Sequence, residues 1–468
     1  RLMSQEMRAL SVTPVPNTSP AARWRKKGRH PRRPPNLTRA VSNHLSDAEV
    51  ESLREDTPGV RGVTPTTKGG IAHFNAAGSS LPPRCVLDAQ VEYLQYEATH
   101  GGYETTEDKS DALQLPYTAL ATLLNCSQDE IAISQSATSA WQMAFGSLLN
   151  TFNPGDRVLT ARCEYASNYI NYLQAVKEKE IVIEVVPSDE YGQLDVGALE
   201  EMLTADRAPV KLVSITHIPT SGGLINDAAA IGKLTKKHDV PFLLDACQSV
   251  GQMPVDVEQL RCDFLVGTGR KYLRGPRGIG FLYARKQFIN KTKCEPMMLD
   301  LHGARWDSAT SYVPAKGAKR FEQYEVAFCA KAGLGVAVEY ALALGVERTW
   351  QRMCLLAEEL RKELQKIQGV TVCDVGENKC GIVTFDVLNV SVEKVRTELH
   401  SKHGVNVWTS RICNNTRMEW EGRKRGKGKD DLPSDVVRAS VAYFNEGWEI
   451  DRLVKGVEEI AKKKRAEE

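Results

Sequence analysis

The feature that most constrains this chain is a regular alternation of short apolar runs with helical stretches between residues 129 and 268. The runs are rich in Val, Ile, Leu and Phe and are nearly continuous, which is typical of strands buried on both faces. Helical patterns over 138–150 and 227–238 separate some of them. We therefore expect an α/β fold with a mostly parallel sheet covered by helices on both faces. The six runs are 129–134, 156–161, 181–187, 211–218, 240–246 and 262–268.

The remainder of the chain extends this sheet and then changes character. A further run at 278–285 follows a tight Gly/Pro turn, and we expect it to pair antiparallel, at the edge of the sheet or within it. After about residue 321, long helical patterns lead through short strands to another helix near 392–404. This order predicts a smaller α+β domain over 322–468, next to a large domain over 71–321.

The N-terminal part differs in composition from the rest. Residues 1–44 carry ten Lys and Arg residues and one acid, without a periodic apolar face, so we expect a disordered basic tail. Such a start also suits an organelle transit peptide, which would make the protein mitochondrial or plastidial rather than cytoplasmic, and a nucleic-acid-binding tail is a third alternative. Residues 45–70 should form an arm that packs on the smaller domain, beginning with a helix over 45–56 capped by Ser46.

Charge and cysteine content argue against several classes of protein. Residues 45–468 carry 51 basic and 58 acidic residues, a net charge of −7, which argues against a nucleic-acid-binding surface. No apolar run is long enough for a transmembrane helix. The 11 cysteines lack paired spacing, so we expect free thiols in a reducing compartment and no metal site.

Two charged residues stand at the ends of buried strands. Asp245 lies at the C-terminal end of the run at 240–246, and Lys271 follows 26 residues later in a Gly-rich turn just past the next strand. Taken alone, Asp245 could cap a helix, and a lone lysine is usually solvated. Open α/β sheets, however, bind ligands at the carboxyl ends of their strands. Together the two residues suit pyridoxal 5'-phosphate, which needs an amine of lowered pKa for a Schiff base and a carboxylate on its pyridine nitrogen.

The segments that contain them, DACQSVGQMPVDV and GRKYLRGPRGIGFLY, resemble the cofactor-binding core of the class V aminotransferase family. This family includes cysteine desulfurases, selenocysteine lyases and isopenicillin-N-epimerase-like enzymes, and the resemblance runs from about His73 to Leu453. It implies a pyridoxal-phosphate enzyme of fold type I, with a seven-stranded type of sheet in the large domain. It also implies an amino acid as the small-molecule substrate and a homodimer with active sites at the interface.

The resemblance assigns roles in cofactor binding around the strand ends. Lys271 would form the Schiff base, Asp245 would pair with the pyridinium nitrogen, and Gln248 would hydrogen-bond the phenolate oxygen. Thr268 and Arg270 match positions that bind the phosphate. Arg270 replaces the usual His, but a guanidinium serves the same oxyanion.

Three further segments would complete the cofactor site. SQSATSAWQ (134–142) matches a turn that opens a helix, so Ala137 and Thr138 would offer backbone N–H groups to the phosphate. A simple helix cap is the alternative explanation of this turn. Tyr165 aligns with the ring-stacking His of the family, and an aromatic ring still suits that contact. Thr220 stands where the family often has an Asn near the phenolate oxygen.

Substrate contacts are expected from two more segments. Arg438 lies in VVRASVAYFNEGWEIDRL (436–453), which matches the family's substrate-carboxylate motif, and its guanidinium would grip the carboxylate in a bidentate pair. Without the resemblance, Arg438 could equally be a surface residue of an edge strand. His100 and Tyr103, in the segment 97–107, are candidates for contacts to the substrate.

The reaction is less constrained than the cofactor. We expect a C–S lyase that eliminates a β-sulfur group from a cysteine-like substrate, because the enzymes that the chain resembles act on such substrates. An aminotransferase or an epimerase at Cα is the alternative. A cysteine desulfurase is a second one, since Cys413 lies 25 residues ahead of Arg438, although without the sequence context of desulfurase cysteines. A catalytically silent binding protein is the non-enzyme alternative, and the set of Asp245, Gln248 and Lys271 argues against it.

Overall fold

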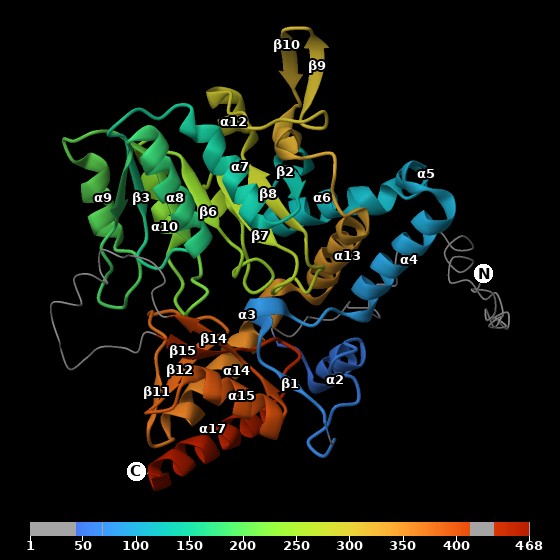
Figure 1. Cartoon of the computed structure of the whole chain (residues 1–468), viewed down its shortest axis with the longest axis vertical. Coiled ribbons are helices and arrows are strands. Elements are labelled where there is room, and N and C mark those ends of the chain that lie inside the picture. Colours follow the sequence, from blue (N-terminus) through green and yellow to red (C-terminus); the bar gives the residue numbers. More distant parts are fainter. Residues whose placement is uncertain (1–43, 68, 412–434, 468) are drawn as a thin grey trace, which may run out of the picture. The chain divides into compact units, whose positions relative to one another are not determined.

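The computed structural model describes residues 44–67, 69–411 and 435–467, and its centre is a seven-stranded sheet (Figure 1). The strand order is β2-β8-β7-β6-β5-β3-β4. Strand β8 is antiparallel to both neighbours, β7 and β2, whereas the other strands run in one direction. The predicted mostly parallel sheet is therefore confirmed, and its antiparallel strand lies within the sheet. The strands are β2 (Ile131–Ser134), β3 (Arg157–Thr160), β4 (Val182–Val185), β5 (Val210–Thr216), β6 (Phe242–Asp245), β7 (Phe264–Thr268) and β8 (Gly280–Ala284).

Helices cover both faces of this sheet because successive strand residues point to opposite sides. In β6, Phe242 and Leu244 join one apolar cluster with helices α6, α9, α10 and α13, whereas Leu243 joins another with α7 and α8. Both clusters are buried, which explains why the strands are almost continuously apolar. These helices are α6 (Ser110–Leu124), α7 (Ala137–Leu149), α8 (Ala166–Lys179), α9 (Val196–Thr204), α10 (Ala228–Lys237) and α13 (Phe328–Leu344).

A second, four-stranded sheet has the order β11-β12-β15-β14 and is antiparallel throughout. Its apolar residues pack with α14, α15 and α17 into one cluster. Strand β15 is central, which determines the setting of Arg438. The elements are α14 (Val346–Gln365), β11 (Val370–Val372), β12 (Ile382–Val387), α15 (Val392–His403), β14 (Trp408–Arg411), β15 (Asp435–Ser440) and α17 (Gly447–Glu467).

The N-terminal arm begins with α2 (Asp47–Glu55), and Ser46 caps it through a reciprocal capping box with Glu49, as expected from the sequence. Val50 and Leu53 of α2 belong to the same apolar cluster as the four-stranded sheet. Further along, β1 (Ala72–His73) pairs in parallel with β13 (Val405–Asn406). The arm thus packs against the C-terminal elements.

Residues 84–124 and 286–321 had no expected structure, and both contain regular elements. The first segment forms three helices, of which α4 and α6 pack against α13. The second contains a hairpin that stands clear of the sheet in Figure 1. The boundary placed at residue 321 stays a prediction. The elements are α3 (Ala76–Ser79), α4 (Arg84–His100), α5 (Gly102–Asp108), η1 (Gln128–Glu130), α11 (Val257–Leu260), α12 (Lys286–Thr292), β9 (Ala304–Ser308), β10 (Ser311–Pro314) and η2 (Gly317–Phe321).

No single helix in the described ranges is long and apolar enough to cross a membrane. Helices α13 and α14 meet the length and composition criteria as a pair, but with a bend of 79° between them.

Candidate active site

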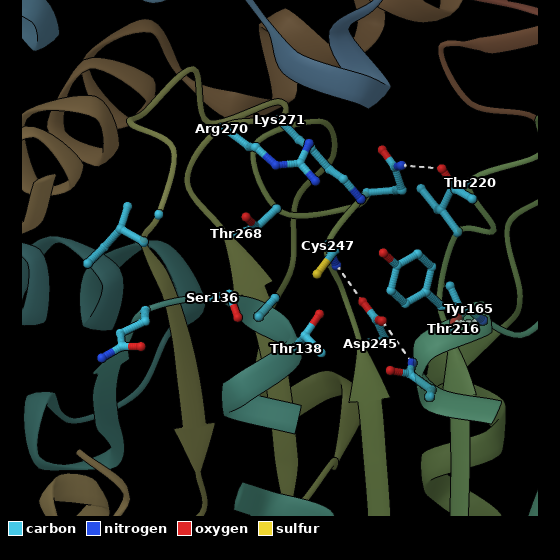
Figure 2. Close-up of a pocket in the computed structure, with 17 residues that line it drawn as sticks. Ser136, Thr138, Tyr165, Thr216, Thr220, Asp245, Cys247, Thr268, Arg270 and Lys271 are labelled. Atoms are coloured by element: carbon cyan, nitrogen blue, oxygen red, sulfur yellow. Dashed lines mark hydrogen bonds between the residues drawn. The ribbon is translucent and has the colours of Figure 1, made fainter. Parts of the chain in front are cut away.

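A pocket lies at the carboxyl ends of β5, β6 and β7, bordered by the first turn of α7 (Figure 2). Parallel strands bring their last residues to one edge of a sheet, so residues far apart in sequence meet there. All nine residues predicted to bind the cofactor line this pocket. They are Ala137, Thr138, Tyr165, Thr220, Asp245, Gln248, Thr268, Arg270 and Lys271.

Asp245 is the last residue of β6 and is buried. Its Oδ1 accepts a hydrogen bond from the backbone N–H of Cys247 at 3.0 Å, and its Oδ2 accepts one from Asn168 Nδ2 at 3.0 Å. An ionised carboxylate offers about four acceptor positions. Asp245 therefore retains the capacity to accept a further donor from the pocket.

Lys271 lies in the turn after β7 and enters the pocket from the side opposite Asp245 in Figure 2. Its side chain is buried, and burial lowers the pKa of its amine. The positive charges of Arg270 and Arg438 lower this pKa further, whereas Cys247 and Asp245 raise it. A buried amine of lowered pKa is what nucleophilic attack on a carbonyl requires.

Groups that favour an anion meet at the α7 end of the pocket. Ser136 caps α7 by accepting a hydrogen bond from Ser139 N at 3.0 Å, and the first-turn N–H groups of a helix have no acceptor within the helix. The Thr268 hydroxyl and the Arg270 guanidinium lie across the pocket from this turn in Figure 2. Arg270 also donates to the Gly78 carbonyl. This arrangement suits a phosphate group.

Gln248 is held in one orientation by two acceptors. Its Nε2 donates to Ala77 O at 3.1 Å and to Thr220 Oγ1 at 3.0 Å. Its Oε1 is buried and has no hydrogen-bond partner in the described ranges. Because buried polar atoms are nearly always paired, this oxygen indicates a place for a donor that the described residues do not supply.

Arg438 is a buried residue of the central strand β15, so the alternative of a surface residue on an edge strand is wrong. Its Nη1 donates to Thr220 O at 3.1 Å and Thr220 Oγ1 at 2.8 Å, and its Nη2 donates to Asn75 Oδ1 at 3.2 Å. Burial lowers its pKa to about 10. No carboxylate in the described ranges pairs with it. Arg438 is not among the residues that line the pocket, but its partner Thr220 is, so a buried cation lies directly behind the pocket wall.

Comparison with known proteins gives the family. The model described as aminotransferase class-V matches residues 72–453. The chain belongs to the class V aminotransferase family. It is therefore a pyridoxal-phosphate-dependent enzyme, a lyase or a transferase, with fold type I.

Two curated relatives and two solved structures illustrate the similarity. A probable cysteine desulfurase of Methanothermobacter thermautotrophicus is 29% identical over 415 residues, which is 88% of this chain and 98% of the relative. A cysteine desulfurase of Pectobacterium atrosepticum is 27% identical over 419 residues, again 88% and 98%. Apo cysteine desulfurase of Thermococcus onnurineus NA1 superposes with a TM-score of 0.77 at 23% identity, covering 88% of this chain and 98% of that one. The cystine C–S lyase C-DES in complex with cysteine persulfide superposes with a TM-score of 0.71 at 21% identity, covering 83% and 97%.

The pocket of this class V enzyme fits pyridoxal phosphate on its own geometry. The α7 turn, Thr268 and Arg270 would hold the phosphate at one end of the pocket, and the Lys271 amine and the Asp245 carboxylate face each other across the middle. Tyr165 precedes α8 and places its ring, which is 36% exposed, beside Asp245, where it suits contact with the face of a planar ligand.

Two residues predicted to contact the substrate do not reach this pocket within one chain. His100 ends α4 and stacks on Tyr96, with ring centroids 3.8 Å apart. Tyr103 lies in the first turn of the neighbouring α5 and is 73% exposed. Their role stays a prediction that requires a second subunit. Cys413 and residues 1–43 lie outside the described residues.

Among the pocket residues that were missed from the sequence, three lie close to Asp245. Asn168 and Thr216 line the wall next to Asp245, and Cys247 lies two residues beyond it. Burial, reinforced by the charge of Asp245, raises the pKa of the Cys247 thiol well above its usual value. The available signal for Asn168 was a polar residue one helical turn after Glu164 at the start of α8, a pattern that also occurs at ordinary helix starts.

Proposed function

We propose that this enzyme cleaves the carbon–sulfur bond of a cysteine-like amino acid by β-elimination. The observation that carries the proposal is one site built from a buried amine of lowered pKa, a buried carboxylate and a buried guanidinium without an acidic partner in the described ranges. These groups belong to Lys271, Asp245 and Arg438. The names of the curated relatives, which are cysteine desulfurases, support a sulfur-containing amino acid as the substrate.

The protein's part in this reaction is to bind, orient and move protons. Bound pyridoxal phosphate supplies an electron sink for negative charge at the substrate Cα. Lys271 would hold the cofactor through its amine, and Asp245 would keep a proton on the ring nitrogen. The first turn of α7 with Thr268 would hold the phosphate, joined by Arg270.

Arg438 would pair with the substrate carboxylate, which fixes the Cα–H bond relative to Lys271. The amine of Lys271, whose lowered pKa leaves more of it neutral, would accept the Cα proton. The β-sulfur would then leave with the electron pair of the C–S bond and take up a proton as a thiol. The remaining carbon skeleton hydrolyses to pyruvate and ammonia.

A cysteine desulfurase is the second candidate, favoured by the relatives' names and by Cys413 in the stretch ahead of Arg438. A desulfurase transfers the substrate sulfur to an enzyme thiolate, so it needs a reactive cysteine. Of the described cysteines, Cys247 lines the pocket, and its thiol has a strongly raised pKa. The lyase therefore ranks first.

We also propose that the enzyme is a homodimer. Leu87, Val91 and Leu94 lie on one side of α4 and are 40–51% exposed, an apolar stripe suited to burial against a second subunit. His100 and Tyr103 continue from the same helix into α5. In a dimer through this surface, they would contact the substrate of the partner.

The test is a product analysis with L-cysteine, L-cystine and S-substituted cysteines. A lyase releases pyruvate, ammonia and a thiol or persulfide in equal amounts. Alanine with an enzyme-bound persulfide would show the desulfurase instead. A keto acid formed with an intact sulfur group would show an aminotransferase, and an inverted amino acid with nothing released would show an epimerase.

A further inference from the structure

A second carboxylate, that of Glu164, lies behind the wall of the pocket and is 3% exposed. Its Oε1 accepts hydrogen bonds from Tyr165 N at 2.7 Å, from Asn168 Nδ2 at 3.0 Å and from the Thr216 hydroxyl. Its Oε2 accepts one from Thr160 Oγ1 at 3.1 Å. Tyr165, Asn168 and Thr216 all line the pocket. One carboxylate thus holds three residues of the wall next to Asp245.

Asn168 connects this carboxylate to Asp245. Its Nδ2 donates to Glu164 Oε1 and to Asp245 Oδ2, each at 3.0 Å. An amide has one donor end and one acceptor end, and the donor end alone can satisfy two carboxylate oxygens. Glu164 therefore fixes the orientation in which Asn168 presents a donor to Asp245.

Electrostatics connects the two carboxylates as well. Burial raises the pKa of Glu164 to about 7, the Thr216 hydrogen bond opposes the shift, and the negative charge of Asp245 adds to it. Asp245 on β6 and Tyr172 on α8 are titratable groups that face Glu164, and the pKa of the buried Tyr172 phenol is raised well above its usual value. Near neutral pH, Glu164 can therefore change charge one amide away from Asp245.

We propose that Asn168 and Glu164 are positioning residues, which hold the Asp245 carboxylate in place and set the potential that it presents to the cofactor ring nitrogen. The inference rests on the proposed role of Asp245, and it is independent of what happens to the substrate sulfur. Asp245 would keep a proton on the ring nitrogen of the cofactor. Asn168 orients the Asp245 carboxylate through a hydrogen bond, and Glu164 orients Asn168 in the same way.

The chain offers a matched control for this network. In α17 and the turn before it, Asn445 and Glu449 form another buried Asn–Glu pair four residues apart, with Asn445 Nδ2 donating to Glu449 Oε2 at 3.1 Å. This pair lies outside the pocket lining. Substitutions there remove a similar buried interaction without touching the surroundings of Asp245.

The experiment compares Asn168→Ala and Glu164→Gln with Asn445→Ala and Glu449→Gln in the holoenzyme. Three properties are measured: the absorption spectrum of the bound cofactor between pH 5 and 9, its dissociation constant, and kcat and KM. We expect Asn168→Ala to shift the pH dependence of the spectrum and to lower kcat about tenfold or more, the scale of one hydrogen bond to a charged group, while KM changes little.

Glu164→Gln keeps the shape of the side chain but removes its titration. It should keep the cofactor bound and lose any spectral step near pH 7. The control variants should lower the melting temperature and leave the spectrum and its pH dependence as in the parent. The proposal is wrong if Asn168→Ala and Glu164→Gln behave like the controls. A shifted spectrum in an enzyme that releases no sulfur would overturn the lyase function and leave the positioning role intact.

Discussion

Two buried Asn–Glu pairs with the same spacing lie in different parts of the molecule and have different neighbours. At the pocket, Asn168 bridges Glu164 to a second carboxylate, Asp245. At the start of α17, Glu449 accepts hydrogen bonds from Asn445 and from Arg54 Nη1, the latter at 2.9 Å. Burial raises the pKa of both glutamates, but Asp245 adds to the shift at Glu164, whereas Arg54 opposes it at Glu449.

The difference teaches that the neighbour, rather than the local motif, decides what a buried carboxylate does. With a cation beside it, Glu449 forms an ion pair with Arg54 at 2.9 Å, which ties α2 of the N-terminal arm to α17. With a carboxylate beside it, Glu164 is close to changing its protonation state at neutral pH. We expect the first pair to matter for stability and the second for the cofactor.

The largest effect should come from the residue that faces Asp245 across the pocket. Lys271→Ala removes the amine proposed to hold the cofactor and to accept the Cα proton, so we expect turnover to be abolished. Borohydride reduction and peptide mapping of the parent enzyme should place the pyridoxyl label on Lys271. A label on another lysine would contradict the assignment.

The second prediction concerns the stabilising pair. Arg54→Ala leaves Glu449 buried without its cation, so we expect the free energy of unfolding to fall by about 3–5 kcal/mol. Urea titration measures the loss, and cofactor content at low denaturant serves as the control. A variant that is as stable as the parent, or that loses the cofactor selectively, would remove the contrast between the two regions.

The third prediction tests the buried cation of Arg438, which lies behind Thr220 at the pocket wall. Arg438→Ala should lower kcat/KM, because the substrate carboxylate loses its buried partner. The expected loss corresponds to about 3 kcal/mol or more of transition-state stabilisation. Steady-state kinetics on the substrate identified by the product analysis gives the number. Arg438→Lys is a useful companion, since a lysine keeps the charge but not the bidentate geometry.

A smaller effect concerns stability and pH. A carboxyl whose folded-state pKa lies above its unfolded value binds more protons in the folded state, so its contribution to stability is complete below the unfolded pKa and is lost as pH rises through the folded one. For Glu164 the window runs from the ordinary glutamate pKa of 4.5 up to about 7. Between pH 5 and 8, we expect the unfolding free energy of the parent to decrease by about 2 kcal/mol relative to Glu164→Gln. Parallel pH profiles for the two proteins would contradict the expectation.

The smallest effect is expected at Cys413. A lyase expels the sulfur group without an acceptor thiol, so Cys413→Ser should keep at least about half of the activity. Activity of the variant on the true substrate is the measurement. Complete loss, with a persulfide detected on Cys413 in the parent, would make the protein a desulfurase.

The strands and the residues at their ends could be predicted because long apolar runs and a charged residue at a strand end are signals within one segment. The antiparallel direction of β8 was also predicted, but its place between β2 and β7 depends on pairing with distant strands. The β9–β10 hairpin was missed, since Trp306 and Tyr312 are exposed and its apolar pattern is weak. The helix α6 contains Pro116, which interrupts a helical pattern in the sequence.

The residues of the site could be predicted where a single side chain supplies the chemistry. They could not be predicted where their role depends on contacts between distant segments. Lys271, Asp245 and Arg438 stand in recognisable segments. The bridge from Glu164 through Asn168 exists because α8 lies beside the end of β6, and no pattern within residues 164–168 specifies that neighbour. His100 and Tyr103 are exposed on α4 and α5, and a contact between two subunits cannot be predicted from a pattern within one segment.

The antiparallel β8 has a consequence for how Lys271 can move. The segment between β7 and β8 is anchored at both ends, with Thr268 paired to Gly280 and Gly269 N donating to Ile279 O at 3.2 Å. Lys271 is therefore mounted on a short, braced connection rather than on a long crossover. Its amine can move by rotation about side-chain bonds while the backbone of this connection stays in place. The Lys271 side chain can therefore change conformation while its Cα stays fixed by the pairing of β7 with β8.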